Sequence, residues 1–149
     1  MDRPLYPFTA VVGQERAKQA LLCLAVEPRI GGVLLCGEKG TAKSTLVRAL
    51  GGLDGVRPLE LPVMLLGGVE LEAAVRTGCR TFQPGLLARA DGAVLYADEV
   101  NLLPSALTAA LLDTLETGVC RVERDGISHT CPARFALVGT MNPEEGTLR

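Results

Sequence analysis

The stretch Gly32–Thr45 reads GVLLCGEKGTAKST and decides the fold. Its first five residues form a short apolar run bounded by glycines, which is typical of a strand buried on both faces of a sheet. The glycine-bearing segment 37–45 follows, and a helical pattern continues through Thr45–Leu50. A glycine-rich turn between a strand and a helix directs successive backbone N–H groups toward one point. The positive end of the helix adds to this attraction, so the stretch predicts a phosphate-binding loop.

The residues of this loop suit a nucleoside triphosphate. Gly37 and Gly40 allow tight turns of the backbone. Lys43 would reach the β- and γ-phosphates, and the Ser44 hydroxyl would bind Mg²⁺. The pattern G-x-x-x-x-G-K-[ST] has Ala42 in place of its second glycine, and a methyl group fits there if the backbone φ is negative. The other residues of the expected phosphate-binding set are Glu38, Lys39, Thr41 and Thr45.

Two adjacent acids follow a second buried run. Ala93–Ala97 (AVLYA) predicts a strand, and Asp98 and Glu99 come directly after it. A carboxylate at the carboxyl end of a parallel strand lies at the edge where open α/β sheets bind ligands. Asp98 suits Mg²⁺, and Glu99 suits a general base that activates water for attack on the γ-phosphate. Such a pair also fits a solvated turn, but the loop at 37–45 favours the binding role.

A polar segment follows another buried run, Phe135–Gly139 (FALVG). Asn142, in GTMNP at 139–143, could donate a hydrogen bond to the γ-phosphate or orient the attacking water. Taken alone, Asn142-Pro143 also fits a simple turn.

The remaining patterns complete an α/β fold. Short apolar strands that alternate with helices favour a mostly parallel sheet. Helices are predicted at 14–25, 69–76, 84–90 and 104–117, and a further strand is predicted at 59–61.

An antiparallel hairpin is predicted at 119–131. Asp125-Gly126 is a strong signal for a two-residue hairpin turn, because both turn residues need a positive φ. A turn at this position pairs Arg124 with Ile127, Val122 with His129, and Cys120 with Cys131. In a reducing cell, two facing thiols are favoured over a disulfide.

The composition of the chain excludes several classes of protein. The 149 residues correspond to one domain, with 48% hydrophobic residues and a formal net charge of −2. No run of about 18 apolar residues occurs, so no membrane span is expected. Met1–Pro4 lacks the apolar region of a signal peptide, so no secretion signal is expected either. The charge balance and the 3% aromatic content provide no basic or stacking surface for nucleic acid. Five cysteines without a C-x-x-C pair favour reduced thiols and a cytoplasmic location.

Five segments together resemble the ATPase subunit of magnesium chelatase and its relatives among the AAA+ ATPases. The resemblance covers nearly the whole chain, in order. It implies a three-layer P-loop NTPase core of the AAA+ type over 1–149, with an inserted β-hairpin. The segments are FTAVVGQ (8–14), GEKGTAKST (37–45), FQPGLLARADGAVLYADEVNLL (82–103), GVCRVERDGIS (118–128) and FALVGTMNPEEG (135–146).

The same resemblance implies a role for each residue singled out above. ATP and Mg²⁺ would be the ligands, and residues 62–78 would correspond to an insertion that family members carry. The implied roles are adenine contacts for Val12 and Gly13, the Walker A loop for 37–45, the Walker B acids for Asp98 and Glu99, and sensor 1 for Asn142.

The resemblance also implies an assembly. Family members form ring oligomers in which a neighbour's arginine finger completes the site, and they drive metal insertion into a tetrapyrrole on a larger partner subunit. In the family, a segment like 146–149 is followed by that arginine, a fifth strand and a helical lid. The fold expected here lacks the strand and the lid, so 32–36 becomes an unpaired apolar edge. Hydrolysis is expected to be weak, because an arginine finger contributes a factor of ~10³–10⁵ in rate.

Three other functions use some of the same residues. A related AAA+ chaperone or remodelling ATPase would apply the site to another client, and some such relatives act on DNA. A nucleotide-binding remnant would control partner binding without turnover. A small-molecule kinase fits poorly with the Asp98-Glu99 pair and the hairpin.

Overall fold

The computed structural model describes residues 6–53, 55–61, 68–69, 82–83, 85–124 and 127–145. In this part of the chain, no helix is both long and apolar enough to cross a membrane. The α-helices are α1 (Glu15–Val26), α2 (Lys43–Ala49), α4 (Leu86–Arg89) and α5 (Ser105–Thr117). The strands are β1 (Gly32–Cys36), β2 (Pro58–Glu60), β3 (Gly68–Val69), β4 (Phe82–Gln83), β5 (Val94–Ala97), β6 (Val119–Arg124), β7 (Ile127–Pro132) and β8 (Ala136–Met141). The 3₁₀ turns among the described residues are η1 (Phe8–Ala10), η2 (Pro28–Ile30), η3 (Leu50–Gly52), η4 (Val100–Leu102) and η5 (Pro143–Glu145).

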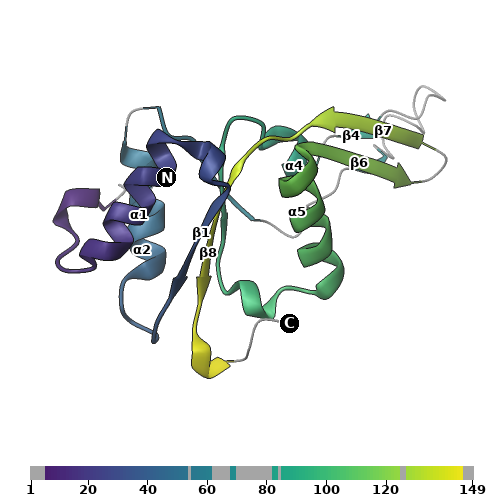
Figure 1. Ribbon diagram of the computed structural model, residues 1–149. Helices are drawn as coiled ribbons and strands as arrows, with labels where there is room; N and C mark the ends of the chain where they lie inside the picture. Colours follow the sequence, from purple (N-terminus) through teal and green to yellow (C-terminus); the bar gives the residue numbers. More distant parts are fainter. Residues whose placement is uncertain are drawn as a thin grey trace.

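A four-stranded parallel sheet forms the middle layer of the molecule. Its strand order is β1-β8-β5-β2, so the carboxyl ends of all four strands lie at one edge. Helices α1 and α2 cover one face, and α4 and α5 lie on the other (Figure 1). This arrangement confirms the predicted three-layer α/β fold.

Two hydrophobic clusters hold the layers together, one on each face of the sheet. Neighbouring residues of the central strands alternate between them: Tyr96 and Val138 face α1 and α2, whereas Leu95 and Leu137 face α4 and α5. All four residues of β5 are buried, as the apolar run 93–97 predicts. The continuous apolar character of this strand therefore reflects a sheet covered on both sides.

Strand β1 departs from the expected burial. Of its five residues only Leu35 is buried, and Leu34, on the opposite face, is 42% exposed. The expectation of a strand buried on both faces is therefore wrong for this segment. The reason is position: β1 pairs with β8 alone and forms the edge of the described sheet, so it receives less cover than β5. Within the described residues, 32–36 thus forms an exposed edge of the sheet.

The loop between β1 and α2 contains a backbone conformation that the sequence pattern did not anticipate. Ala42 has φ 62° and ψ 20°, in the left-handed region, and directly precedes α2. The negative φ required for an unstrained methyl group is therefore not observed. Helix α2 also begins at Lys43 rather than at Thr45, because Ala42 turns the chain into the helix two residues earlier.

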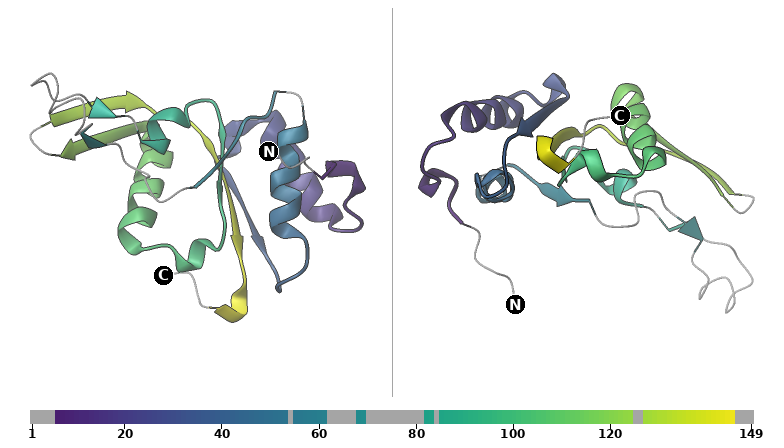
Figure 2. Two further views of the ribbon diagram at one scale, coloured as in Figure 1. Left: turned by 180° about the vertical axis from the view of Figure 1, so that it is seen from behind. Right: turned by 90° about the horizontal axis from the view of Figure 1, so that it is seen from below.

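The hairpin agrees with its predicted register at every pair. Strands β6 and β7 are antiparallel, with Arg124 opposite Ile127, Val122 opposite His129, and Cys120 opposite Cys131. Both cysteines are free, as expected. Burial raises the pKa of the Cys120 thiol to about 11. The hairpin projects from the α5 side of the molecule (Figures 1 and 2).

The other predicted elements vary in accuracy. The helices at 14–25 and 104–117 are confirmed to within one residue, and the strand at 59–61 is shifted by one. The helix predicted at 84–90 is shorter and begins at Leu86. The helix predicted at 69–76 is wrong at Val69, which pairs in the β3–β4 ladder, and its remaining residues lie outside the described part of the chain.

Replacement of Ala42 by glycine should stabilise the fold. A left-handed conformation costs a residue with a Cβ about 1–2 kcal/mol, and the added entropy of glycine in the unfolded chain offsets only part of this. We expect Ala42→Gly to raise the free energy of unfolding by about 0.5–1 kcal/mol, measured by urea denaturation. The matched control is Ala109→Gly in the exposed middle of α5, where the same change should cost about 1 kcal/mol. Destabilisation by both substitutions would contradict the strain at Ala42.

Candidate functional site

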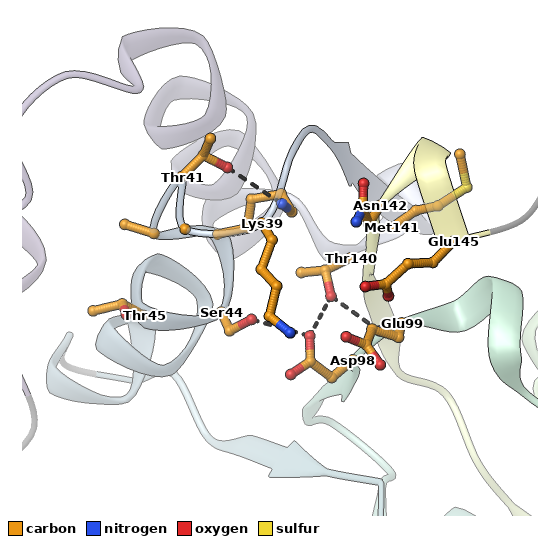
Figure 3. Close-up of a pocket in the computed structure, with 13 residues that line it drawn as sticks. Lys39, Thr41, Ser44, Thr45, Asp98, Glu99, Thr140, Met141, Asn142 and Glu145 are labelled. Atoms are coloured by element: carbon orange, nitrogen blue, oxygen red, sulfur yellow. Dashed lines mark hydrogen bonds between the residues drawn. The ribbon is translucent and has the colours of Figure 1, made fainter.

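A cleft of about 350 Å³ opens at the carboxyl edge of the sheet. Three segments that are distant in the sequence form it: the loop before α2, the residues after β5, and the end of β8 with the turn that follows (Figure 3). The lining residues are Lys39, Gly40, Thr41, Ala42, Lys43, Ser44, Thr45, Asp98, Glu99, Thr140, Met141, Asn142 and Glu145.

Asp98 is the meeting point of these three segments. The Ser44 hydroxyl donates a hydrogen bond to Asp98 Oδ1 at 3.0 Å, and the Thr140 hydroxyl donates to the same oxygen. Ser44 lies in the first turn of α2, and Thr140 belongs to β8, which pairs with β5. The sequence separates Ser44 from Asp98 by 54 residues, so the predicted convergence of loop and acid is present (Figure 3).

The surroundings of Asp98 favour its ionised form. Burial raises the pKa of the carboxyl group, but the hydroxyl groups of Thr140, Tyr96 and Ser44 lower it. The Arg48 guanidinium, 3.8 Å from Oδ2, lowers it further. Because the pKa lies below its usual value, Asp98 is a carboxylate at neutral pH.

Arg48 is held behind the site by a second acid. Its guanidinium donates to both carboxylate oxygens of Glu60 on β2, at 2.7 and 3.3 Å, and lies 5.8 Å from the centre of the Tyr96 ring. The Tyr96 hydroxyl is buried and has no hydrogen bond of normal geometry within the described residues. Burial raises the pKa of Tyr96 to about 12. This arrangement keeps a positive charge beside Asp98 while Tyr96 stays neutral.

The Lys43 side chain lies inside its own loop. Its ammonium donates to the carbonyl oxygens of Gly37 at 2.6 Å and Glu38 at 2.7 Å, and to Thr41 Oγ1 at 3.2 Å. The three donors of the ammonium match these three acceptors. The contacts fix the shape of the loop and place the positive charge at its centre.

Glu99 also has a left-handed backbone, with φ 51° and ψ 56°. This conformation costs about 1–2 kcal/mol for a residue with a Cβ. A hydrogen bond from the Glu99 N–H to Thr140 Oγ1, at 3.1 Å, helps to hold it. The turn leads into η4, whose Val100 packs closely on β8. A Cβ on Gly139 would lie 2.9 Å from Val100 Cγ1, so a side chain at position 139 would prevent this approach. Glu99 lines the cleft beside Asp98 (Figure 3).

Asn142 directly follows β8, is buried and lines the cleft. Its Oδ1 accepts a hydrogen bond from the Glu144 N–H at 3.2 Å. This hydrogen bond engages the carbonyl end of the amide and leaves the NH₂ group as the donor end of the side chain.

Four of the residues expected at the site lie outside the lining of the cleft. Gly37 and Glu38 lie behind it and hold Lys43. Val12 is 95% exposed, and Gly13 is also exposed. The side chain of the next residue, Gln14, donates to the Thr41 carbonyl at 3.1 Å, so this segment adjoins the loop without lining the cleft.

Several residues of the site were not expected from the sequence. Thr140 stands within the segment GTMNP, and its position one residue beyond the Ala97–Gly139 pair places it beside Asp98. A register argument could therefore have found it. Glu145 lines the cleft although its position after Pro143 fits an ordinary turn. Arg48 and Glu60 carry no sequence signal, because their pairing depends on how α2 packs on the sheet.

The oxygen atoms at the centre of the site fit a magnesium ion. Mg²⁺ prefers oxygen ligands and is usually bound through one or two protein groups together with the phosphates of a nucleotide. The Ser44 hydroxyl and the Asp98 carboxylate supply such oxygens, 3.0 Å apart. These two residues would hold the ion.

Comparisons with known proteins agree with the geometry. The family model described as the MCM P-loop domain matches residues 7–149. The magnesium-chelatase subunit ChlI of Cyanophora paradoxa is 42% identical over 99% of this chain and 56% of its own length. The magnesium-chelatase 38 kDa subunit of Cereibacter sphaeroides is 41% identical over 100% of this chain and 56% of its own length.

Two further matches extend the comparison. An uncharacterized protein of Mycobacterium tuberculosis is 53% identical over 97% of this chain and 25% of its own length. A solved structure of the complex between subunits BchI and BchD of magnesium chelatase matches with a TM-score of 0.78 and 42% identity, covering 99% of this chain and 58% of the matched chain.

The chain spans about half the length of the chelatase subunits and a quarter of the mycobacterial protein. The resemblance to magnesium-chelatase subunits is confirmed, and the domain is of the P-loop ATPase type. The chain belongs to the family of the MCM P-loop domain, and within it resembles the ChlI and BchI subunits of magnesium chelatase.

Proposed function

We propose that this chain binds Mg²⁺-ATP in the cleft and hydrolyses it. The observation that carries the proposal is the hydrogen bond between Ser44 and Asp98, because it joins the phosphate-binding loop to the acid that follows β5. The loop supplies backbone N–H groups and the N-terminus of α2 to the phosphates. Lys43 supplies the positive charge for the β- and γ-phosphates.

The roles of the other residues follow from their places around the cleft. Ser44 and Asp98 would hold Mg²⁺, which neutralises charge on the β- and γ-phosphates when it is bound. Glu99 would take a proton from the attacking water. Asn142 would donate its NH₂ to the γ-phosphate or to that water.

The adenine would lie next to Val12 and Gly13. Val12 is almost fully exposed, and the hydrogen bond between Gln14 and Thr41 holds its segment against the phosphate-binding loop. Val12 would therefore offer the base an apolar surface beside this loop. Burial of this surface by the base would be favourable.

We propose further that this chain works within a ring of subunits. In such a ring a neighbour's arginine would complete the site, and the hydrolysis cycle would drive metal insertion into a tetrapyrrole on a partner subunit. The support is the 40% or greater identity to proteins named magnesium-chelatase subunits and the structural match to a BchI–BchD complex. The cytoplasm is the compartment that the free thiols of Cys23, Cys36, Cys120 and Cys131 favour.

Removal of the Lys43 ammonium should abolish nucleotide binding. A charge-assisted hydrogen bond contributes about 1.5–3 kcal/mol, and Lys43 also shapes the loop, so we expect Lys43→Ala to weaken ATP binding by about 100-fold or more. Isothermal titration calorimetry measures the loss. Lys18→Ala, on α1 and away from the cleft, is the matched control and should bind ATP as the wild type does. ATP binding that survives in Lys43→Ala would remove the basis of the proposal.

Glu99→Gln should separate binding from chemistry. Glutamine keeps the shape of the side chain but cannot accept a proton, so ATP affinity should stay nearly constant while kcat falls by about 10²–10⁴-fold. Phosphate release is measured with the chain alone and with a full-length relative that can supply neighbouring subunits. Glu123→Gln, on the exposed face of the hairpin, is the control. Unchanged hydrolysis in Glu99→Gln would rule out Glu99 as the base. If the wild-type chain binds ATP but releases no phosphate, alone or with the relative, the result would favour a nucleotide-binding remnant without turnover.

The client is tested by complementation. We expect the protein, added to the partner subunits of a magnesium chelatase, to support metal insertion into a tetrapyrrole that depends on ATP. The insertion is followed by the absorbance of the tetrapyrrole. Lys43→Ala in the same background should abolish it. ATP turnover without any metal insertion would favour a remodelling ATPase with another client.

A further inference from the structure

Thr140 contacts both acids of the site through one hydroxyl group. Its Oγ1 donates to Asp98 Oδ1 and accepts from the Glu99 N–H at 3.1 Å. The side chain is 1% exposed, so water does not replace these contacts easily. A single buried hydroxyl therefore connects the carboxylate of one acid to the backbone of the next (Figure 3).

The two contacts have different physical effects. The bond to Oδ1 fixes the rotation of the Asp98 carboxylate, which also accepts from Ser44 at 3.0 Å. The bond from the Glu99 N–H holds a residue whose left-handed φ of 51° is unfavourable for glutamate. Because Thr140 is donor to one and acceptor to the other, its hydroxyl has one orientation that satisfies both.

The position of Thr140 in the sheet makes these contacts rigid. Ala97 pairs with Gly139, so Thr140 and Asp98 extend from adjacent parallel strands at the same level. Asn142, two residues farther along the chain, also lines the cleft.

We propose that Thr140 is a positioning residue that orients Asp98 toward a divalent cation and holds Glu99 in its cleft-facing turn. The proposal rests on the proposed function, since it concerns the same Mg²⁺-ATP site. In this role Thr140 does not bind the cation itself but holds the residues that would bind it. The hydroxyl of Thr140, and not the size of its side chain, would then set the affinity for the metal–nucleotide complex. Partners of this kind orient metal ligands in many proteins, and their loss typically weakens metal binding by about 10–100-fold.

The test compares nucleotide affinity with and without magnesium. The dissociation constant of a non-hydrolysable ATP analogue is measured by calorimetry in Mg²⁺ and again in EDTA, and the ratio gives the contribution of the ion. Thr140→Val keeps the shape of the side chain and removes the hydroxyl, so it should reduce this ratio by about 10–100-fold while the affinity in EDTA stays close to that of the wild type. Thr140→Ser retains the hydroxyl and should restore most of the ratio.

The matched control is Thr114→Val on α5. Thr114 is also a buried threonine, but its hydroxyl bonds to the Ala110 carbonyl of its own helix, away from the cleft. This variant should leave the magnesium ratio unchanged. If Thr140→Val does not fold, as judged by circular dichroism, Thr140→Ala is measured in its place with the same expected loss.

Each outcome decides the proposal. An unchanged magnesium ratio in Thr140→Val, or an equal loss of affinity in Mg²⁺ and in EDTA, overturns the positioning role while the Lys43 result still supports nucleotide binding. Failure of Thr140→Ser to recover the ratio assigns the effect to packing and also overturns it. A wild-type chain that binds no nucleotide in either buffer overturns the proposed function together with this inference.

Discussion

One carboxylate oxygen, Asp98 Oδ1, joins the three parts of the structure that form the cleft. It accepts from Ser44 in the first turn of α2 and from Thr140 at the end of β8, and it extends from β5. An ionised carboxylate accepts such hydrogen bonds more strongly than a neutral acid, and the nearby Arg48 guanidinium also favours the charged form of Asp98. The hydrogen bonds that join the three segments of the cleft therefore converge on a single side chain.

The parallel sheet makes this junction possible. All four strands run in the same direction, so their carboxyl ends lie at the same edge of the sheet. This edge brings together the loop after β1, the acids after β5 and the end of β8. The order β1-β8-β5 places the strand of Thr140 between the strand that precedes the loop and the strand that precedes the acids. The two hydrophobic clusters, one on each face of the sheet, hold the strands in place relative to one another.

Sequence patterns predicted the α/β class with a mostly parallel sheet, the strand–loop–helix unit and the hairpin register, because these depend on local periodicity and turn chemistry, whereas the three layers were implied by the family resemblance. They did not predict the positive φ of Ala42, since the loop geometry overrides the preference of a residue with a Cβ. They also overestimated the burial of β1, because an apolar run does not report which strand lies at an edge. The pairing of Arg48 with Glu60 depends on the packing of α2 on β2, which local patterns do not encode.

The link between the hairpin and the sheet is only three residues long. β7 ends at Pro132 and β8 begins at Ala136, and the link between them is fastened by Arg134, whose N–H donates to Asp91 Oδ1 and whose carbonyl accepts from the Gly92 N–H. The chain therefore runs without a long loop from the hairpin, past the two Arg134 hydrogen bonds, along β8 to the cleft. The base of the projecting hairpin is thus tied to the turn before β5, which is the strand that leads to Asp98.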